Sequence, residues 1–134
     1  FVSSDISVLS AAVSDFKPKK IVFNKIKKDN NQSLLIDLVP NVDILNHLGT
    51  LKRDDQLLVG FALETDNEIK NAIKKIKSKN LDAIVLNSLN DEGAGFRHNT
   101  NKITFINNKN NIIEFELKSK HEVSIDIFNQ IDNL

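Results

Sequence analysis

Three apolar runs in the sequence predict the strands of a buried β-sheet. They lie at residues 6–13, 57–63 and 81–86, and few polar side chains interrupt them. Continuous runs of this kind are typical of parallel strands covered on both faces, whereas a strand with one solvent-exposed face alternates apolar and polar residues. We therefore expect these three segments to form the centre of the sheet.

The segment between the second and third runs has the period of a helix. Its apolar residues recur as on the inner face of an amphipathic helix. They are Ile69, Ala72, Ile73 and Ile76. Thr65 or Asp66 can cap the start of this helix and Asn80 can end it. Residues 57–87 are thus predicted to form a strand, a helix and a parallel strand, joined by a right-handed crossover.

Two elements are predicted between the first and second runs. Residues 21–28 and 33–39 alternate apolar with polar positions on either side of a polar turn at 29–32, and this alternation predicts a two-stranded arm. Asn41 is expected to cap a short helix, and Gly49 is expected to lie just past its end.

The carboxyl-terminal third predicts a hairpin and a last helix. The hairpin strands are expected at residues 102–106 and 112–117, and a capping box from Ser119 to Glu122 opens the helix. The inward side chains of this helix are expected to be Val123, Ile127, Phe128 and Ile131. Together the elements predict a single α/β domain over residues 1–134, with a mostly parallel sheet and flanking helices.

Composition and charge narrow the classes of function. Eighteen basic and eighteen acidic side chains cancel, so the chain lacks the basic field that drives nonspecific binding to nucleic acids or anionic membranes. Cysteine is absent, which excludes disulfides, thiolate metal sites and cysteine nucleophiles. No apolar run approaches the roughly 20 residues of a membrane helix. We expect a cytoplasmic protein, and its start at Phe1 instead of Met predicts a fragment that lacks an amino-terminal part.

Polar residues follow each predicted central strand. Asp15 comes after the first strand, Glu64 and Thr65 after the second, and Asn87 after the third. Ligands of open α/β sheets bind outside the carboxyl ends of the strands, so we expect these residues to converge on one crevice. In the alternative interpretation, Asp15 and Thr65 only cap loops and helices.

Lysines gather in two places. Six lie between residues 17 and 28, where Lys25 and Lys27 would share one face of an extended strand and suit a polyanion. A lysine-rich arm can also simply be solvated and protected from edge-to-edge pairing. The second group, at 74, 75, 77 and 79, falls late in the predicted helix, where cations also favour the helix dipole.

Other candidate chemistry is sparse. Phe61 lies inside an apolar strand and is by default a core residue, although a ring near the end of a strand can also support a nucleobase. The sequence contains no HExxH motif, no Ser-His-Asp arrangement and no phosphate-binding glycine loop. A hydrolase is therefore not indicated.

Seven motifs follow one another along the chain in a recognisable order. They are AAVSDF (11–16), KIKK (25–28), NVDIL (41–45), LVGFALET (58–65), KNLDAIVLN (79–87), GF (95–96) and SKHE (119–122). In this order and spacing they resemble bacterial phosphopantothenoylcysteine synthetase, in its carboxyl-terminal part, over essentially all 134 residues. That Rossmann-like enzyme is often fused to phosphopantothenoylcysteine decarboxylase.

The resemblance implies a ligase of coenzyme A biosynthesis that joins 4'-phosphopantothenate to cysteine. CTP is the usual bacterial activator: an acyl-cytidylate and pyrophosphate would form first, and the amine of cysteine would then displace CMP. A lysine pair and Mg²⁺ would supply the charge neutralisation that phosphate chemistry needs. FMN is implied only where a decarboxylase half is fused. The sequence does not distinguish CTP from ATP.

The resemblance also implies nucleotide contacts, carried over position by position. They are Leu9, Ser10, Ala11, Asp15, Lys25, Val42, Asp43, Ile44, Leu45, Phe61, Lys75 and Lys79. Lys25 would be catalytic because it neutralises phosphate and acyl-phosphate charge, and Asp15 would bind either the ribose or a metal. Val42 stands where the family usually has proline, which should loosen the helix start without removing a side-chain contact.

Two further expectations follow from the resemblance. The glycine-rich turn and SNxSSG stretch of the family's amino-terminal segment have no counterpart here, so we expect the chain alone to be inactive. The resemblance implies a homodimer formed through the arm at residues 20–39, whose alternating apolar residues would be buried against the partner. They are Ile21, Phe23, Leu34, Ile36 and Leu38. The alternatives are a nucleotide-binding or dimerisation module without catalysis and, on the lysines alone, an RNA-binding arm.

Overall fold

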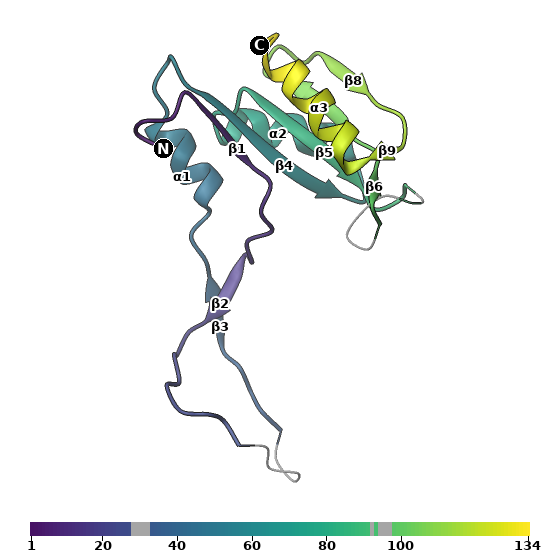
Figure 1. Ribbon diagram of the computed structural model, residues 1–134. Coiled ribbons are helices and arrows are strands. Elements are labelled where there is room, and N and C mark those ends of the chain that lie inside the picture. The colour runs from purple at the N-terminus through teal and green to yellow at the C-terminus, as the bar shows by residue number, and fades with distance from the viewer. Residues whose placement is uncertain (28–32, 92, 94–97) are drawn as a thin grey trace. The chain divides into compact units, whose positions relative to one another are not determined.

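The computed structural model describes residues 1–27, 33–91, 93 and 98–134 (Figure 1). Contacts between residues divide the chain into two compact units: Phe1–Ser10 with Ile44–Leu134, and Ala11–Asp43. Lys28 of the KIKK motif, the turn predicted at 29–32 and the GF motif at 95–96 lie outside the described residues.

The first unit is built on a mixed five-stranded sheet. The strand order is β1 (Ile6–Leu9), β4 (Leu57–Glu64), β5 (Ala83–Ser88), β7 (Thr104–Asn107) and β8 (Ile112–Glu114). Strands β1, β4 and β5 are parallel, and the remaining pairs are antiparallel. The predicted strand–helix–strand unit is confirmed, because α2 (Glu68–Ser78) connects the parallel strands β4 and β5.

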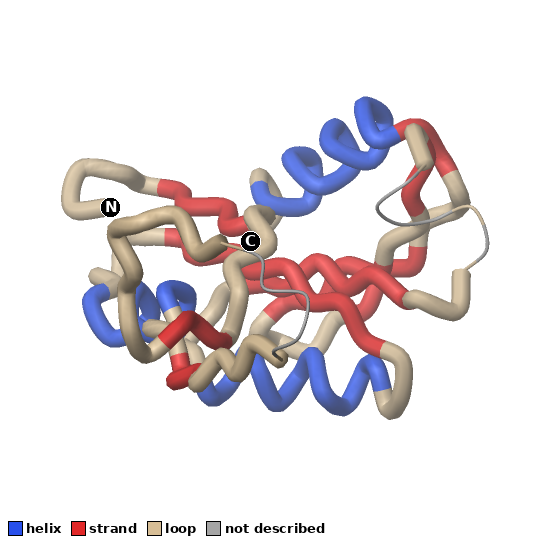
Figure 2. Tube along the Cα trace, turned by 90° about the horizontal axis from the view of Figure 1, so that it is seen from below, coloured by secondary structure: helices blue, strands red, loops and turns tan. Residues whose placement is uncertain are grey.

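Helices cover both faces of this sheet. Figure 2 shows α1 (Ile44–Leu51) and α2 on one side and α3 (Lys120–Ile131) on the other. Successive residues of β4 alternate between the two cores, so that Leu58 packs on the α2 side and Val59 on the α3 side. Both side chains are fully buried, and each such burial stabilises the fold by about 1.5–3 kcal/mol.

The first strand differs from its prediction. It ends at Leu9, not at residue 13, and it lies at the edge of the sheet. Ile6 is 44% exposed and the other three residues are only half-buried. Leu9 packs on the α2 side and Val8 on the α3 side, but neither is fully buried. The expectation of a fully buried strand is therefore wrong for β1, because an apolar run does not reveal whether a strand has a neighbour on each side.

Helix α1 also begins and ends differently from its prediction. It starts at Ile44, and the Asn41 side chain instead accepts a hydrogen bond from the Val42 N–H (3.0 Å). Gly49 lies inside the helix, where a Cβ atom would come within 1.9 Å of the Lys79 carbonyl oxygen. Asn80 fixes the same contact by donating to the Gly49 carbonyl (3.1 Å). Gly49 is thus required by the close approach of α1 to the end of α2, not by a helix stop.

We expect Gly49→Ala to lower the free energy of unfolding by about 1–3 kcal/mol, because the backbone of one helix must shift to admit the methyl group. Gly60→Ala is the matched control: its Cβ would meet the end of the flexible Leu45 side chain at 2.6 Å, so a smaller loss is expected. Urea unfolding monitored by circular dichroism measures both. A Gly49→Ala chain as stable as the wild type would contradict this account of the helix contact.

The ends of α2 and α3 show which capping signals were informative. Asn67, in the left-handed conformation, directly precedes α2, so the predicted caps Thr65 and Asp66 are wrong. Asn80 was predicted to end this helix, and it follows the helix with a positive φ of 53°. The capping box of α3 is confirmed: the Ser119 hydroxyl accepts from the Glu122 N–H, and the Glu122 carboxylate accepts from the Ser119 N–H (3.0 Å).

One predicted core residue of α3 is exposed. Val123, Ile127 and Ile131 are buried, but Phe128 is 58% exposed. Residues four apart define the inner stripe of this helix, and Phe128 is about 100° around the axis from Ile127. The predicted hairpin is confirmed in shortened form as β7 and β8, and β6 (Thr100–Asn101) pairs separately with β9 (Lys118–Ser119).

The second unit contains one short strand pair. Strand β2 (Phe16–Pro18) pairs antiparallel with β3 (Leu38–Pro40), and the Lys19 N–H donates to the Asp37 carbonyl beyond this pair (2.9 Å). The predicted arm strands are wrong for residues 21–27 and 33–37, which have no regular secondary structure. Apolar and polar residues do alternate here, but the described residues of this unit leave the large apolar side chains exposed.

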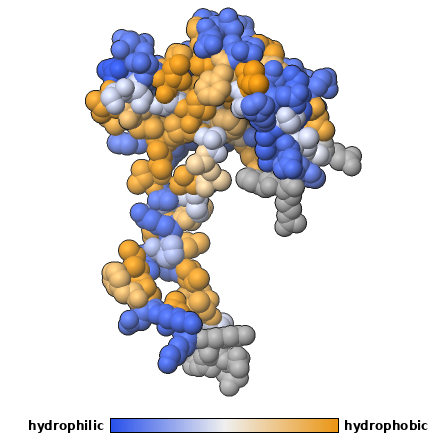
Figure 3. All heavy atoms as spheres, viewed as in Figure 1, coloured by the Kyte–Doolittle hydropathy of each residue, from blue (hydrophilic) through white to orange (hydrophobic). Residues whose placement is uncertain are grey.

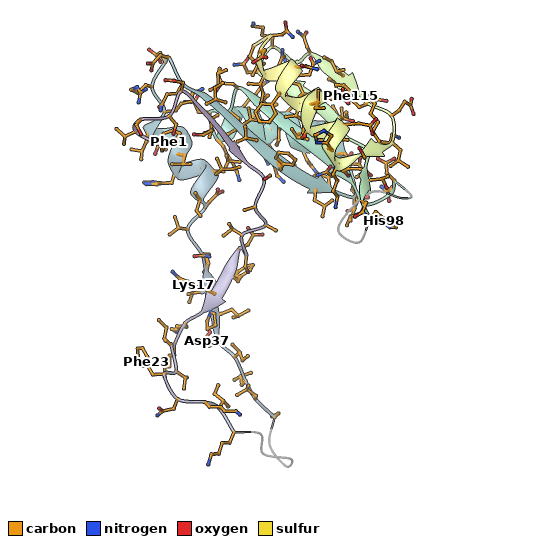
Figure 4. All side chains as sticks on the ribbon, viewed as in Figure 1. Phe1, Lys17, Phe23, Asp37, His98 and Phe115 are labelled. Atoms are coloured by element: carbon orange, nitrogen blue, oxygen red, sulfur yellow. The ribbon has the colours of Figure 1, made fainter. Side chains whose placement is uncertain are left out.

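Many apolar side chains of this unit are exposed. Phe23 is 94% exposed and Leu35 93%. Figure 4 shows Phe23 pointing outward, and Figure 3 shows apolar atoms on the surface along these segments. Within the part of the chain that the structure describes, no helix is long and apolar enough to cross a membrane.

Candidate functional site

Three of the predicted strand-end residues lie at the same edge of the sheet. Glu64, the last residue of β4, is in register with Ser88, the last residue of β5, and Asn87 is in register with Leu63. Thr65 follows directly after Glu64. These residues therefore share one edge of the sheet, but Glu64 bonds to side chains of α2 and Asn87 to Asn101 on the other face, so their convergence on one crevice stays a prediction. Asp15 belongs to the other unit, and its convergence with them also stays a prediction.

Glu64 is held by two side chains of α2. Its Oε1 accepts from the Lys75 ammonium (2.5 Å) and its Oε2 from the Asn71 carboxamide (3.2 Å). Asn71 and Lys75 are four residues apart and so share one face of the helix. The Glu64 side chain is 14% exposed and that of Lys75 is 40% exposed. The hydrogen bond from Lys75 lowers the pKa of Glu64, against the opposing effect of burial, so this carboxylate is ionised at neutral pH.

The loops that follow both strands are fixed by a second set of hydrogen bonds. The Ser88 hydroxyl donates to the Glu68 carboxylate, and the Asn90 carboxamide donates to the same carboxylate and to the Thr65 carbonyl (both 3.1 Å). The Leu89 N–H donates to the Glu64 carbonyl (3.1 Å). These hydrogen bonds tie the loop after β4 to the loop after β5.

Two carboxamides meet on the other face of this edge. The Asn101 Nδ2 of β6 donates to the Asn87 Oδ1 (2.9 Å). The Asn101 Oδ1 is buried and accepts no hydrogen bond from the described residues. A buried acceptor without a donor is unfavourable and marks this pair as unusual in a folded chain.

Two of the predicted nucleotide contacts come together on the α2 side of the sheet. Leu9 is in register with Gly60, and the Leu45 side chain lies over the same glycine, where a Cβ would approach Leu45 Cδ2 within 2.6 Å. Both leucines pack against the core on this side. Ser10, directly after β1, and Ile44, the first residue of α1, are exposed.

The other predicted contacts of this unit are spread over both faces. Phe61 packs against the core on the α3 side, opposite to α2, and is half-buried. Lys75 is engaged with Glu64, as described above. The carbonyl of Lys79 faces Gly49 at the far end of α2. A ligand that touched both Phe61 and Lys75 would have to lie across the end of β4.

The second unit holds the remaining predicted contacts, and part of them are adjacent. The Asn41 N–H donates to the Asp15 carbonyl (2.7 Å), and the Asn41 side chain donates to the Ser14 carbonyl (3.1 Å). These bonds bring the Asp15 segment next to Val42 and Asp43. Ala11 and Asp15 are exposed.

Lys25 lies farther along this unit, beyond the β2–β3 pair, and is exposed. Its ammonium forms no ion pair with any described residue of the chain. The described residues also bring together no group of three or more His, Cys, Asp or Glu side chains that would hold a metal on their own. The role of Asp15 at a magnesium ion or a ribose stays a prediction.

Sequence reasoning identified Glu64 as a strand-end residue but not as the partner of Lys75. The signal was available, because a helix directly after a strand returns over its end, and Asn71 and Lys75 follow Glu64 at helical spacing. Asn101 was missed altogether. Its position depends on the long-range pairing of β6 with β9, for which the local sequence gives no signal.

The first unit has an open α/β sheet with helices on both faces and polar residues at the carboxyl ends of its parallel strands. This arrangement is typical of nucleotide-binding domains. The profile of the family described as "DNA/pantothenate metabolism flavoprotein C-terminal domain" matches residues 1–134. The chain belongs to this family.

Two curated relatives match nearly the whole chain. A "Cysteine/Cysteine sulfinic acid decarboxylase" from an unspecified prokaryote is 55% identical over 131 residues, which are 98% of this chain and 36% of that protein. The "Coenzyme A biosynthesis bifunctional protein CoaBC" of Bacillus subtilis (strain 168) is 41% identical over 129 residues, 96% of this chain and 31% of that protein. The chain thus spans about a third of the length of the curated relatives it matches.

Solved structures share the fold. The crystal structure of the C-terminal domain of the coenzyme A biosynthesis bifunctional protein CoaBC superposes with a TM-score of 0.74 and 35% identity, covering 97% of this chain and 54% of that chain. The Cab2 mutant H337A in complex with phosphopantothenate-cysteine superposes with a TM-score of 0.57 and 22% identity, covering 80% of this chain and 36% of that chain. The second likeness establishes the fold alone.

Proposed function

We propose that this chain is the carboxyl-terminal part of a phosphopantothenate–cysteine ligase, a cytoplasmic enzyme of coenzyme A biosynthesis that activates its substrate with CTP. The observation that carries the proposal is the family match over residues 1–134, together with relatives named for coenzyme A biosynthesis. The ordered polar edge of β4 and β5 supports it, because such edges are where open α/β sheets bind nucleotides.

In the proposed reaction, a carboxylate oxygen of 4'-phosphopantothenate attacks the α-phosphorus of CTP and pyrophosphate leaves. The amine of cysteine then attacks the acyl carbon of the acyl-cytidylate, CMP leaves with the bonding electron pair, and the amine loses a proton. Both steps gather negative charge on phosphate oxygens, so a positioned ammonium contributes by electrostatic stabilisation.

The residues of the second unit would meet the charged part of the nucleotide. Lys25 is suited to the phosphates because its exposed ammonium has no carboxylate partner among the described residues. Asp15 would hold Mg²⁺ or the ribose, and its backbone is already fixed by Asn41. When bound, Mg²⁺ would neutralise phosphate charge. FMN would be needed only by a decarboxylase half fused to the same protein.

The residues of the first unit would contact the nucleotide along the end of the sheet. Leu9, Ser10 and Leu45 lie close to Gly60 of β4, and Lys75 lies at its last residue. Phe61 would contact the nucleotide from the α3 side. Ala11, Val42, Asp43, Ile44 and Lys79 complete the proposed set.

We further propose that the protein forms a homodimer through the arm at residues 20–39. A soluble chain rarely exposes so many large apolar side chains without a partner, and eight of them lie in this segment. They are Ile21, Val22, Phe23, Ile26, Leu34, Leu35, Ile36 and Leu38.

We expect Phe23→Asp to weaken dimer formation at least about tenfold, because burying a phenylalanine contributes about 1.5–3 kcal/mol. Val2→Asp is the control, since Val2 is also exposed (87%) but lies outside the arm. Sedimentation equilibrium measures both. An unchanged dimer in Phe23→Asp, or a wild-type chain that is monomeric at every concentration, would remove the arm from the interface.

The ligase proposal is tested by mixing the chain with a separately produced amino-terminal segment of the ligase and supplying 4'-phosphopantothenate, cysteine, CTP and Mg²⁺. Formation of phosphopantothenoylcysteine, detected by mass spectrometry and dependent on both pieces, is the expected result. If the chain binds CTP but no product forms, the alternative of a nucleotide-binding and dimerisation module is favoured.

A further inference from the structure

The main chain around Asp15 is held at three consecutive carbonyl groups. The Asn41 carboxamide donates to the Ser14 carbonyl (3.1 Å), and the Asn41 N–H donates to the Asp15 carbonyl (2.7 Å). The Ser14 hydroxyl donates to the Phe16 carbonyl (2.8 Å). Each carbonyl from residue 14 to residue 16 therefore has a hydrogen-bond partner within the second unit, although these residues are exposed.

Asn41 continues the pairing of β2 with β3 beyond the ends of the two strands. In the register of this pair, which Figure 1 shows side by side, Phe16 lies opposite Pro40. One step further in the same register Asp15 is opposite Asn41, and the bond from the Asn41 N–H joins their main chains. The Asn41 carboxamide adds a second link one residue farther on, at the Ser14 carbonyl. One asparagine thus ties both residues to the end of the strand pair.

The carboxylate of Asp15 differs from its main chain. It is exposed and forms no hydrogen bond or ion pair with another residue of the described ranges. An aspartate that only caps a loop uses its carboxylate to accept a main-chain N–H. A fixed main chain that carries an available carboxylate instead suits a residue that binds a ligand, because the ligand does not have to order the chain.

We propose that Asn41 is a positioning residue that holds the main chain of Asp15, so that the Asp15 carboxylate meets a ribose or Mg²⁺ without first being ordered. The inference rests on the proposed function, because it takes Asp15 to contact the nucleotide. Asn41 acts through Asp15 and not on the ligand. Both ends of its carboxamide are engaged with main chain, the nitrogen at the Ser14 carbonyl and the oxygen at the Val42 N–H (3.0 Å).

The first measurement concerns the main chain alone. NMR relaxation of the 134-residue chain should give the Asp15 amide an order parameter near that of rigid backbone, about 0.85, and Asn41→Ala should lower it to below about 0.6. Asn41→Asp should lower it as well, because aspartate can still accept from the Val42 N–H but cannot donate to the Ser14 carbonyl. If Asn41 only shaped the turn at Val42, the aspartate variant would leave Asp15 rigid.

The second measurement asks whether Asn41 acts through Asp15. Isothermal titration with CTP and Mg²⁺ is carried out on the chain combined with a separately produced amino-terminal segment of the proposed ligase. We expect Asn41→Ala to weaken CTP binding about tenfold, because the ligand must then order the main chain of one residue. In an Asp15→Ala chain the same substitution should have no further effect. A general loss of structure in this unit would weaken CTP binding in both backgrounds.

Asn133→Ala is the matched control for both measurements. It also removes an exposed carboxamide that donates to a main-chain carbonyl, that of Asn129 (2.6 Å), but it belongs to the first unit. It should change neither the order parameter of Asp15 nor the affinity for CTP. Matching circular dichroism spectra would show that the variants keep the fold of the wild type.

The possible contrary results are distinguishable. An Asp15 amide that stays rigid in both Asn41 variants, or an unchanged CTP affinity in Asn41→Ala, would overturn the inference and leave the proposed function intact. Equal weakening with and without the Asp15 side chain would also overturn the positioning role. A wild-type complex that binds no CTP would overturn the nucleotide site of the proposed function and the inference with it, before any variant is compared.

Discussion

Lys25→Gln is expected to reduce the CTP-dependent turnover of the reconstituted ligase at least about a hundredfold, since removing one positioned group that stabilises transition-state charge typically has an effect of this size. Glutamine retains the length and hydrogen-bonding ability of the side chain but not the charge. The measurement is the rate of phosphopantothenoylcysteine formation at saturating substrates.

The control for this variant is Lys17→Gln, which removes another exposed lysine of the same unit that lies outside the arm at residues 20–39. It should leave turnover within about twofold of the wild type, because a surface charge that does not touch the substrate has only a screened effect. Matching circular dichroism spectra would show that both variants fold. Unchanged turnover in Lys25→Gln would remove this lysine from the mechanism.

Asp82→Asn is expected to lower the free energy of unfolding by about 3–5 kcal/mol, the usual cost of leaving one member of a buried ion pair without its partner. Asp82 is 8% exposed, and both of its carboxylate oxygens accept from the Lys52 ammonium, at 2.9 and 2.8 Å. One of them also accepts from the Leu58 N–H at 2.7 Å. Asparagine at this position would leave the Lys52 charge buried without compensation.

Asp55→Asn is the matched control for this prediction. Asp55 also forms an ion pair, with Arg53 at 3.0 Å, but its side chain is 70% exposed. Surface pairs of this kind contribute about 0–1 kcal/mol. Urea unfolding of both variants gives the comparison, and equal stabilities of Asp82→Asn and Asp55→Asn would show that the buried pair does not hold the start of β4 and β5 together.

The sheet and its crossover were predictable because the spacing of apolar residues and the residue that ends the helix indicate the same elements. The run at 57–63, the helical spacing of Ile69 and Ile76, and the stop at Asn80 all favour the same strand–helix–strand unit, and the structure has it. The capping box at Ser119 was equally informative because it is a local arrangement of backbone and side chain.

The arm and Gly49 were not predictable, for a different physical reason. Alternation at residues 21–27 shows which side chains would share a face, but a strand forms only where a neighbour accepts its hydrogen bonds, and the described part of this unit offers such a neighbour only at β2 and β3. Gly49 resembles a helix stop locally. Its actual role depends on Lys79, thirty residues away in sequence, which no local pattern reveals.

The candidate site was predictable to a similar degree. The predicted parallel pairing of β4 and β5 correctly placed Glu64 and Asn87 at one edge, whereas the binding of a ligand there stays a prediction. The ion pair of Lys75 with Glu64 was not predicted, because it depends on how α2 packs over the end of β4. The meeting of Asp15 and Lys25 on one triphosphate stays a prediction.

Release of pyrophosphate before cysteine is added is the decisive measurement for the proposed activation of 4'-phosphopantothenate by CTP. The chain, combined with a separately produced amino-terminal segment of the proposed ligase, is incubated with α-labelled CTP, 4'-phosphopantothenate and Mg²⁺ in the absence of cysteine. We expect one pyrophosphate and one labelled acyl-cytidylate per active site, both dependent on 4'-phosphopantothenate. Cleavage of CTP to CDP and phosphate, or no release of pyrophosphate under these conditions although cysteine later yields product, would contradict it.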